Sequence, residues 1–197
     1  MKKLRRIIRP LLNFANGRNF LENKKVSEMK MFKKIFILVC VMIMTVVSPA
    51  WTQTPNRLQQ FEAWGAYSYK SPENTICYIL SVPLKALPTT VKHGDNFFLV
   101  TKRSNSPVLF EPQFMAGYKL KEGSKVTVTI GDKDFDFFTK DSSAWLTSSG
   151  MEKQLVAAMR SGANMTVKAT SKRGTHTTYT YSLKGVTAAL NMVQKCN

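Results

Sequence analysis

The chain has 197 residues, and its 29 Lys and Arg against 12 Asp and Glu give a formal net charge of +17. Residues 1–34 hold 11 basic and 2 acidic side chains, residues 35–50 hold no charged side chain, and residues 51–197 hold 18 and 10. More than half of the excess charge therefore precedes residue 35. The remaining length suits one domain with its own core and argues against a two-domain enzyme.

An uncharged apolar run at residues 35–47 has the layout of a secretory signal. Two lysines precede the run, and the small-x-small sequence Ser48-Pro49-Ala50 follows it as a cleavage site. The run is shorter than the roughly 18–20 residues that cross a bilayer as a helix, although an uncleaved anchor remains the alternative. We therefore predict an exported protein, located in the periplasm or at the outer membrane, with the cell surface as a further location.

The predicted signal begins unusually far from the first residue. Translation from Met29 or Met31 would give a signal of ordinary proportions, so the start codon stays open between these and Met1. We expect a leader at 1–50, made of an upstream extension at 1–28 and a signal peptide at 29–50, followed by a single domain at 51–197.

Removal of the leader takes Cys40 with it and leaves Cys77 and Cys196. An even pair in an oxidising compartment favours a disulfide. Closing a loop of about 120 residues stabilises a fold by on the order of 4–5 kcal/mol in the chain-entropy model. Two unpaired buried thiols are the alternative, and a catalytic cysteine is less favoured because no CxxC is present and neither histidine is near in sequence.

Alternating apolar and polar residues predict mostly strands after residue 51. Residues 126–130 and 134–137 alternate on either side of Gly131-Asp132, which predicts a β-hairpin with one buried face. Five further strands are predicted at 61–69, 76–82, 96–102, 165–170 and 177–183. About seven short strands with Pro and Gly between them favour an all-β sandwich or barrel.

One clear helix is predicted over 151–160. Met151, Leu155 and Met159 recur at i, i+4 and i+8, and Gly162 stands at the position expected for a C-cap. A second helical turn at 186–193 would carry Cys196 back towards Cys77.

A series of short motifs resembles the invasion-associated locus B family of alphaproteobacteria. The motifs cover roughly residues 60–196 in order, and they are Phe61-x-x-Trp64, Cys77-Tyr78-x-x-Ser81-x-Pro83, Gly117-Tyr118, Glu122-Gly123-Ser124-Lys125-Val126, Ala144-Trp145-Leu146, Ala157-Ala158-Met159-x-x-Gly162, Ser171-x-Arg173-Gly174-Thr175, Tyr181-Ser182-Leu183-x-Gly185 and Ala188-Ala189-Leu190. The resemblance implies an immunoglobulin-like β-sandwich with one short helix and a helical C-terminal turn. It also implies an exported, virulence-associated role in host-cell, notably erythrocyte, invasion. Members often carry another cysteine shortly after the tryptophan, which this chain lacks, so Cys77 with Cys196 is the available intrachain pairing.

No pattern for catalysis, a cofactor or a metal is found. The chain has no Gly-x-Ser-x-Gly, His-Glu-x-x-His or Walker motif, and His93 and His176 fit solvated polar residues better than bases. The four carboxylates Asp132, Asp134, Asp136 and Asp141 fit an exposed strand face better than a calcium loop. Trp64 and Trp145 suggest a carbohydrate-binding surface, but their strand-like positions favour burial in the core.

Basic residues recur at predicted strand ends and loops. Six form the candidate basic binding surface, namely Lys102, Arg103, Lys119, Lys121, Lys172 and Arg173, and Lys92, Lys125 and Lys168 occupy similar positions. Such a surface attracts anionic lipid or glycan as part of an envelope or host-surface component. Charges that only keep strand edges soluble are the alternative, and export argues against nucleic acid as the partner.

Two hypotheses stay open at this point. The first is a non-enzymatic exported protein, monomeric or weakly self-associating, that acts by binding or in the envelope. The second is an exported enzyme whose catalytic group the sequence does not identify, and it needs a cluster of titratable groups. A histidine within hydrogen-bond reach of both a carboxylate and a hydroxyl would favour the enzyme.

Overall fold

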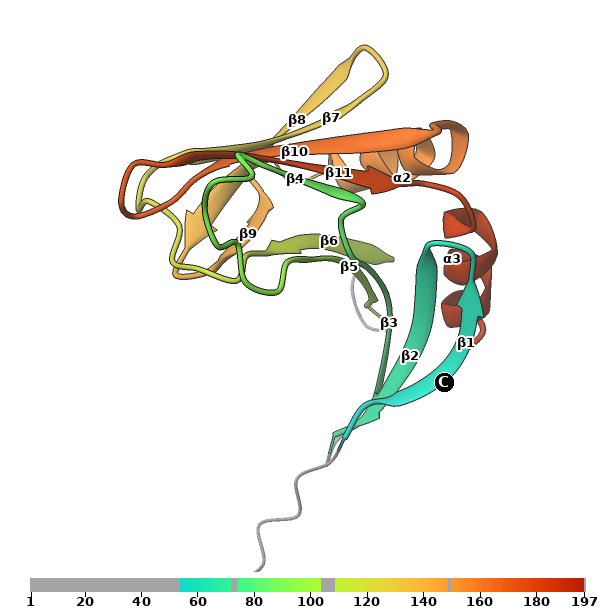
Figure 1. Ribbon diagram of the computed structural model, residues 1–197. Helices are drawn as coiled ribbons and strands as arrows, with labels where there is room; N and C mark the ends of the chain where they lie inside the picture. The colour runs from blue at the N-terminus through green and yellow to red at the C-terminus, as the bar shows by residue number, and fades with distance from the viewer. Residues whose placement is uncertain (1–53, 72–73, 104–108, 149, 197) are drawn as a thin grey trace, which may run out of the picture. The chain divides into compact units, whose positions relative to one another are not determined.

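Eleven antiparallel strands form one continuous sheet in the described part of the chain (Figure 1). The structure is a computed structural model that describes residues 54–71, 74–103, 109–148 and 150–196. The predicted leader therefore lies outside the described residues. The order across the sheet is β1-β2-β3-β5-β6-β9-β8-β7-β10-β11-β4. The strands are β1 Asn56–Phe61, β2 Trp64–Lys70, β3 Thr75–Ser81, β4 Lys85–Leu87, β5 Phe97–Lys102, β6 Phe110–Met115, β7 Lys125–Ile130, β8 Lys133–Lys140, β9 Ser143–Leu146, β10 Asn164–Thr170 and β11 His176–Ser182.

The predicted hairpin is confirmed as β7 and β8, which pair in register from Ile130 opposite Lys133 onward. Phe135 and Phe137 are buried, whereas Asp134 and Asp136 between them are exposed. This is the alternation of a strand with one buried face. The acidic residues of β8 therefore lie on an outer face, as the spacing predicted.

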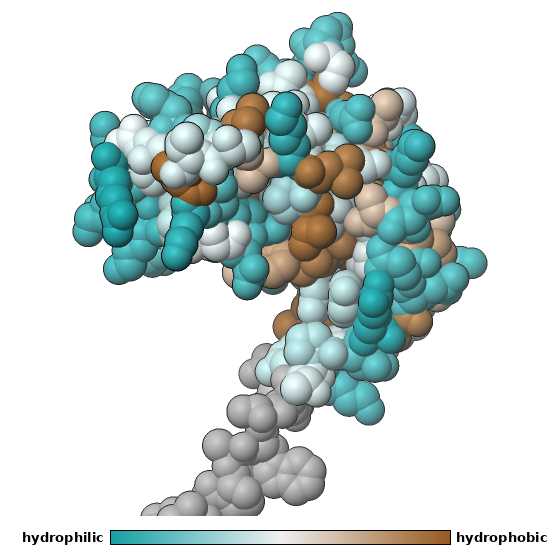
Figure 2. Space-filling model, viewed as in Figure 1, coloured by the Kyte–Doolittle hydropathy of each residue, from teal (hydrophilic) through white to brown (hydrophobic). Residues whose placement is uncertain are grey.

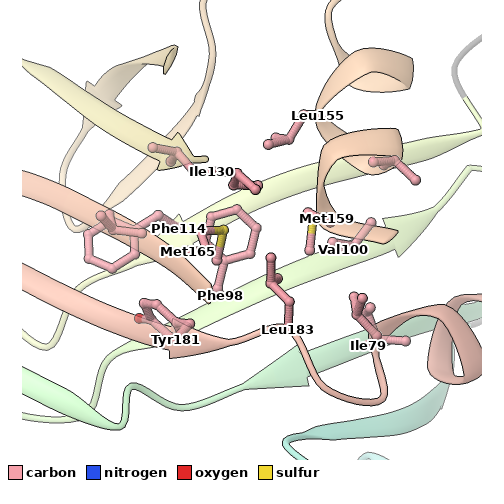
Figure 3. Close-up of a cluster of buried hydrophobic side chains, with 14 of the residues drawn as sticks. Ile79, Phe98, Val100, Phe114, Ile130, Leu155, Met159, Met165, Tyr181 and Leu183 are labelled. Atoms are coloured by element: carbon pink, nitrogen blue, oxygen red, sulfur yellow. The ribbon is translucent and has the colours of Figure 1, made fainter. Parts of the chain in front are cut away.

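The sheet folds over its own core, so that strands distant in the order meet through their side chains (Figures 1 and 3). Phe98 of β5 has its ring centroid 6.4 Å from that of Trp64, 6.2 Å from that of Phe137 and 6.0 Å from that of Tyr181. All four side chains are fully buried, and edge-to-face aromatic contacts of this kind add to the free energy of burial. The predicted immunoglobulin-like β-sandwich with a short helix and a helical C-terminal turn is confirmed.

Two helices cover parts of this core. They are α2, Glu152–Ser161, which packs against β6, and α3, Val186–Gln194, which packs against β1, β2 and β3. Leu155 and Met159 of α2 are fully buried, as their spacing predicted. Gly162 ends α2 in an extended conformation, and a Cβ there would lie 2.7 Å from Ile130, so close packing requires the glycine. No helix among the described residues is both long and apolar enough to cross a membrane.

Four strands escaped prediction, each for a local reason. β1 is exposed along nearly its whole length, so it has no inward apolar set to reveal it. β4 and β9 have three and four residues, too few to show a period of two. β6 contains Pro112, and proline within a run argues against a strand because it lacks an N–H for the ladder.

The two tryptophans have different environments. Trp64 lies in the core as predicted, and its Nε1 donates to the Ser182 carbonyl at 2.9 Å. The prediction that Trp145 is buried in the core is wrong, since Trp145 is half-buried. Its neighbour Ala144 takes the inward position of β9, so the strand's alternation directs Trp145 to the outer face.

The predicted disulfide between Cys77 and Cys196 is present, with Cα atoms 6.3 Å apart and a sequence separation of 119. Cys77 lies in β3, and Cys196 lies two residues after Gln194, the last residue of α3. The bond therefore fastens the end of α3 to the sheet.

Candidate functional site

The structure divides the six predicted basic residues between two places. Lys119 and Lys172 lie side by side, because the Lys172 N–H donates to the Lys119 carbonyl at 2.8 Å. Lys121 and Arg173 are their neighbours in these two segments, which a bridge between Leu120 and Ser171 holds together.

Lys102 and Arg103 lie at the opposite end of the β5–β6 pair, where Lys102 is opposite Phe110. The other end, where Phe97 is opposite Met115, leads to Lys119. A six-residue strand separates its two ends by on the order of 17 Å. Arg103 also forms an ion pair with Glu111, with its guanidinium 2.6 Å from the Glu111 carboxylate. These two residues do not belong to the surface formed by the other four.

A pocket of about 960 Å³ opens where three segments of the chain meet, the loops after β4 and β6 and the turn between β10 and β11. Figure 2 shows hydrophilic side chains gathered over the end of the molecule where these loops lie. We call this the basic pocket, and its lining residues are Val91, Lys92, His93, Tyr118, Lys119, Ser171, Lys172, Arg173, Thr175 and Thr177.

Two glycines and a buried amide set the first two segments against each other. Gly94 has φ +65°, and a Cβ on Gly117 would lie 2.5 Å from the Asp95 nitrogen, so only glycines permit this approach. Asn96, which is 4% exposed, donates to the carbonyls of His93 at 3.1 Å and Gly94 at 2.9 Å. It also accepts from the Gly117 N–H at 3.2 Å. The pocket walls are therefore fixed through the backbone, before any ligand binds.

A chain of hydrogen bonds runs beneath the pocket from loop to sheet. His93 Nε2 lies 2.9 Å from the Pro88 carbonyl, which can only accept, so this nitrogen carries a hydrogen. His93 Nδ1 lies 2.8 Å from Tyr179 Oη, which is 3.1 Å from Tyr118 Oη. Tyr118 Oη in turn lies 2.6 Å from Thr177 Oγ1. The expectation that His93 is a solvated residue is wrong, because both ring nitrogens bond to the protein.

Tyr179 and Tyr181 are buried neighbours on β11 with different phenol environments. Burial is the main cause that raises the pKa of Tyr179, and its hydrogen bond with Tyr118 raises it further. Burial likewise raises the pKa of Tyr181, whose Oη is the one buried side-chain polar atom without a partner among the described residues. Both phenols therefore stay neutral, and the charge at the pocket comes from its rim.

The rim of the basic pocket is strongly positive. Lys92, Lys119, Lys172 and Arg173 are all exposed, and no Asp or Glu is among the lining residues. None of these four cations forms an ion pair with a described residue. Like charges around one concavity repel one another and attract an anion.

Neither histidine has a carboxylate among its hydrogen-bond partners within the described ranges. The hydrogen bonds of His93 go to a phenol and a carbonyl, and that of His176 goes to the Thr170 hydroxyl at 3.2 Å. No group of three or more His, Cys, Asp or Glu side chains in the described part of the chain is placed to hold a metal ion.

These features define an antiparallel β-sandwich with a preformed basic pocket at one end. The crystal structure of invasion associated protein b from Bartonella henselae has the same fold, with a TM-score of 0.52 and 12% sequence identity over 68% of this chain and 92% of that chain. No curated protein sequence matches the chain significantly. The family model described as invasion associated locus B (IalB) protein matches residues 64–194, and the chain belongs to that family.

The sequence predicted part of the basic pocket but not its floor. Lys119, Lys172 and Arg173 were predicted from charge, and Gly117-Tyr118 and Arg173-Gly174-Thr175 stood among the family motifs. His93 and Thr177 were missed because their partners beneath the pocket, Tyr179 for His93 and Tyr118 for Thr177, are 86 and 59 residues away in sequence. A glycine directly after His93 was the one local signal of a tightly held loop.

Proposed function

We propose that this protein is exported and contributes to host-cell, notably erythrocyte, invasion as a non-enzymatic binding protein. Its basic pocket takes an anionic group, a phosphate or a carboxylate, that belongs to an envelope or host-surface component. Membership of the invasion-associated family supports the biological setting, and the pocket supports the chemistry.

The observation that carries the proposal is the charge distribution around the pocket. Four exposed cations surround about 960 Å³ without a carboxylate among the lining residues. Charges that serve solubility alone need no concavity and no fixed walls. The loops that carry two of these cations are instead held in place by the buried Asn96 and by the backbone contact between Gly94 and Gly117. Preorganised walls lower the entropy lost when a ligand binds, which is what a binding site requires.

The first experiment measures binding to two sources of negative charge, using the protein as the cell produces it. One arm uses phosphatidylcholine vesicles with and without phosphatidylglycerol, which presents phosphate, and the other uses 3′-sialyllactose, which presents a carboxylate. We expect one arm to bind and the variant K119E/K172E to bind it at least tenfold more weakly. The matched control is K133E, which reverses one exposed lysine at the β7–β8 turn and leaves binding within twofold.

Two outcomes would contradict the proposal. The first is that neither the vesicles nor the sialylated sugar binds at physiological salt. The second is that K133E and K119E/K172E weaken binding equally per charge reversed, since this would make the effect one of net charge and not of the pocket.

Export and invasion need an experiment in cells. N-terminal sequencing of the protein from fractionated bacteria is expected to begin at Trp51 and to place the protein outside the cytoplasm. Strains that carry K119E/K172E should invade erythrocytes less than strains that carry K133E at equal protein level. A cytoplasmic protein that retains its first 50 residues would contradict the proposed export.

The competing proposal is an exported enzyme. It predicts that the bound probe is chemically altered, which mass spectrometry of the recovered probe detects. We expect the probe to be recovered unchanged, because both histidines bond to uncharged oxygen atoms and neither contacts a carboxylate in the described ranges.

A further inference from the structure

A row of three outward side chains crosses the sheet at β6, β9 and β8. In the pairing register Gln113 lies opposite Trp145, and Trp145 lies opposite Phe138. Residues directly opposite each other on one face have neighbouring side chains. An amide, an indole and a phenyl ring therefore stand side by side on the outer surface, over two inter-strand steps of about 4.8 Å each.

The two rings of this row form a flat aromatic surface. Trp145 and Phe138 are stacked, with ring centroids 5.8 Å apart and an angle of 28° between their planes. Phe138 is 47% exposed, although it directly follows the fully buried Phe137. Leaving an aromatic ring of this size in water forgoes the free energy of its burial. A stacked pair at the surface, with Phe138 exposed and Trp145 half-buried, is therefore a feature that a ligand can explain.

Polar side chains of both signs surround the rings. A shallow pocket of about 500 Å³ includes both rings and is lined by Glu111, Pro112, Phe138, Lys140, Trp145, Leu146 and Glu152. We call it the aromatic platform. Its charges are largely balanced, because Arg103 lies 2.6 Å from Glu111 and Lys125 lies 2.8 Å from Asp136 beside Phe138. The hydrogen bond that Lys125 donates to Asp136 and the negative charge of Asp136 both raise the pKa of Lys125.

We propose that the aromatic platform binds a neutral oligosaccharide. A sugar ring has an apolar C–H face and a rim of hydroxyls, so it needs a flat aromatic surface with hydrogen-bond donors and acceptors at its edge. Trp145 and Phe138 supply the surface, and Gln113, Lys140 and the carboxylates of Glu111 and Glu152 stand around it. This site shares no lining residue with the basic pocket and stands independently of the proposed function.

Charge and size select a sugar over other ligands. Balanced charges give no attraction for a polyanion, in contrast to the basic pocket. A stable protein interface covers about 800 Å² on each partner, and one aromatic side chain supplies roughly 150–250 Å², so two rings and Leu146 fall short of a protein interface.

The test is a titration of the protein with lactose, N,N′-diacetylchitobiose and maltotriose, followed by saturation-transfer NMR of the sugar protons. We expect at least one sugar to bind and its ring C–H protons to receive the strongest transfer. W145A and F138S should each weaken that binding at least tenfold, and W145F should retain most of it because it keeps an aromatic face. The matched control is L84S, which removes a 68% exposed leucine elsewhere and should leave binding unchanged.

Three results would overturn the inference. No transfer to any of the three sugars is the first, and equal binding by wild type, W145A and F138S is the second. The third is that sedimentation shows a dimer which F138S abolishes while no sugar binds, since the platform would then be a contact with a second copy. Because the exposed Phe138→Ser change and the conservative W145F change both leave the core untouched, loss of folding in W145A would not obscure the result.

Discussion

The pocket end and the disulfide end of the sandwich are stabilised by different means. At the disulfide end, the Cys77–Cys196 bond fastens α3 to β3, and α3 buries apolar residues against β1, β2 and β3. At the pocket end, loops meet through the buried Asn96, the backbone contact of Gly94 with Gly117, and the hydrogen-bonded chain from His93 to Thr177.

The difference shows how one fold provides both stability and a charged surface. Apolar packing cannot hold several like charges close together, because burial of unpaired charges is costly. Backbone hydrogen bonds and glycine contacts fix the loops from beneath and leave Lys119 and Lys172 exposed at the rim. Changes at the disulfide end should therefore affect stability alone, whereas changes at the pocket end should also affect anion binding.

The largest expected effect comes from breaking the disulfide. Replacing Cys77 and Cys196 by serine, or adding dithiothreitol, should lower the free energy of unfolding by about 4–5 kcal/mol, since the bond closes a loop of 119 residues. Urea unfolding measures this change. Anion binding should be unchanged wherever the reduced protein is still folded, and coincident midpoints with and without reductant would show that the bond contributes nothing.

The next effect tests the glycine contact at the pocket end. Gly94→Ala and Gly123→Ala place alanine at nearly the same backbone conformation, with φ of +65° and +69°, but only the Cβ on Gly94 meets backbone, 2.7 Å from the Gly117 carbonyl oxygen. Both should lose about 1–2 kcal/mol to strain. Gly94→Ala should lose about 1–3 kcal/mol more to overpacking and should also weaken anion binding. If urea unfolding shows that the two variants lose equal free energy of unfolding, the contact between Gly94 and Gly117 does not stabilise the pocket end.

A smaller effect separates the two buried tyrosines of β11. Tyr179→Phe removes a hydroxyl that bonds to His93 and Tyr118, and it should cost about 1–2 kcal/mol. Tyr181→Phe removes a buried hydroxyl without a partner and should be neutral or stabilising. Thermal unfolding of the two variants in parallel measures the difference. A greater loss from Tyr181→Phe would mean that the hydrogen-bonded chain does not stabilise the pocket end.

The smallest effect concerns Arg103, a predicted surface residue that the fold places away from the pocket. Its exposed ion pair with Glu111 should contribute about 0–1 kcal/mol. Arg103→Ala should therefore leave both unfolding and anion binding nearly unchanged in the assays above. Loss of anion binding in this variant would show that Arg103 takes part in binding the anion, and would contradict its placement away from the basic pocket.

The sequence predicted the elements with strong periodicity and the bond between two cysteines. The β7–β8 hairpin, the spacing of Leu155 and Met159 and the remaining cysteine pair each carry their signal locally. Trp145 was misplaced because β9 has four residues, and only its register beside Phe138 shows which face it occupies.

The basic pocket was only half predictable for a similar reason. Charge drew attention to Lys119 and Lys172 but equally to Lys102, because composition does not say at which end of a strand pair a residue lies. The floor depends on Tyr118 and Thr177, which are 59 residues apart and meet only through the pairing order of the sheet.

The most direct test of the account is to locate the bound anion by NMR. Backbone amide shifts should be followed while the protein is titrated with whichever probe binds, the phosphatidylglycerol headgroup as glycerophosphoglycerol or 3′-sialyllactose. If the anion binds in the basic pocket, the largest shifts will fall on residues 91–94, 117–119 and 171–177. Shifts centred on Lys102 and Arg103, or spread evenly over all lysines, would contradict it.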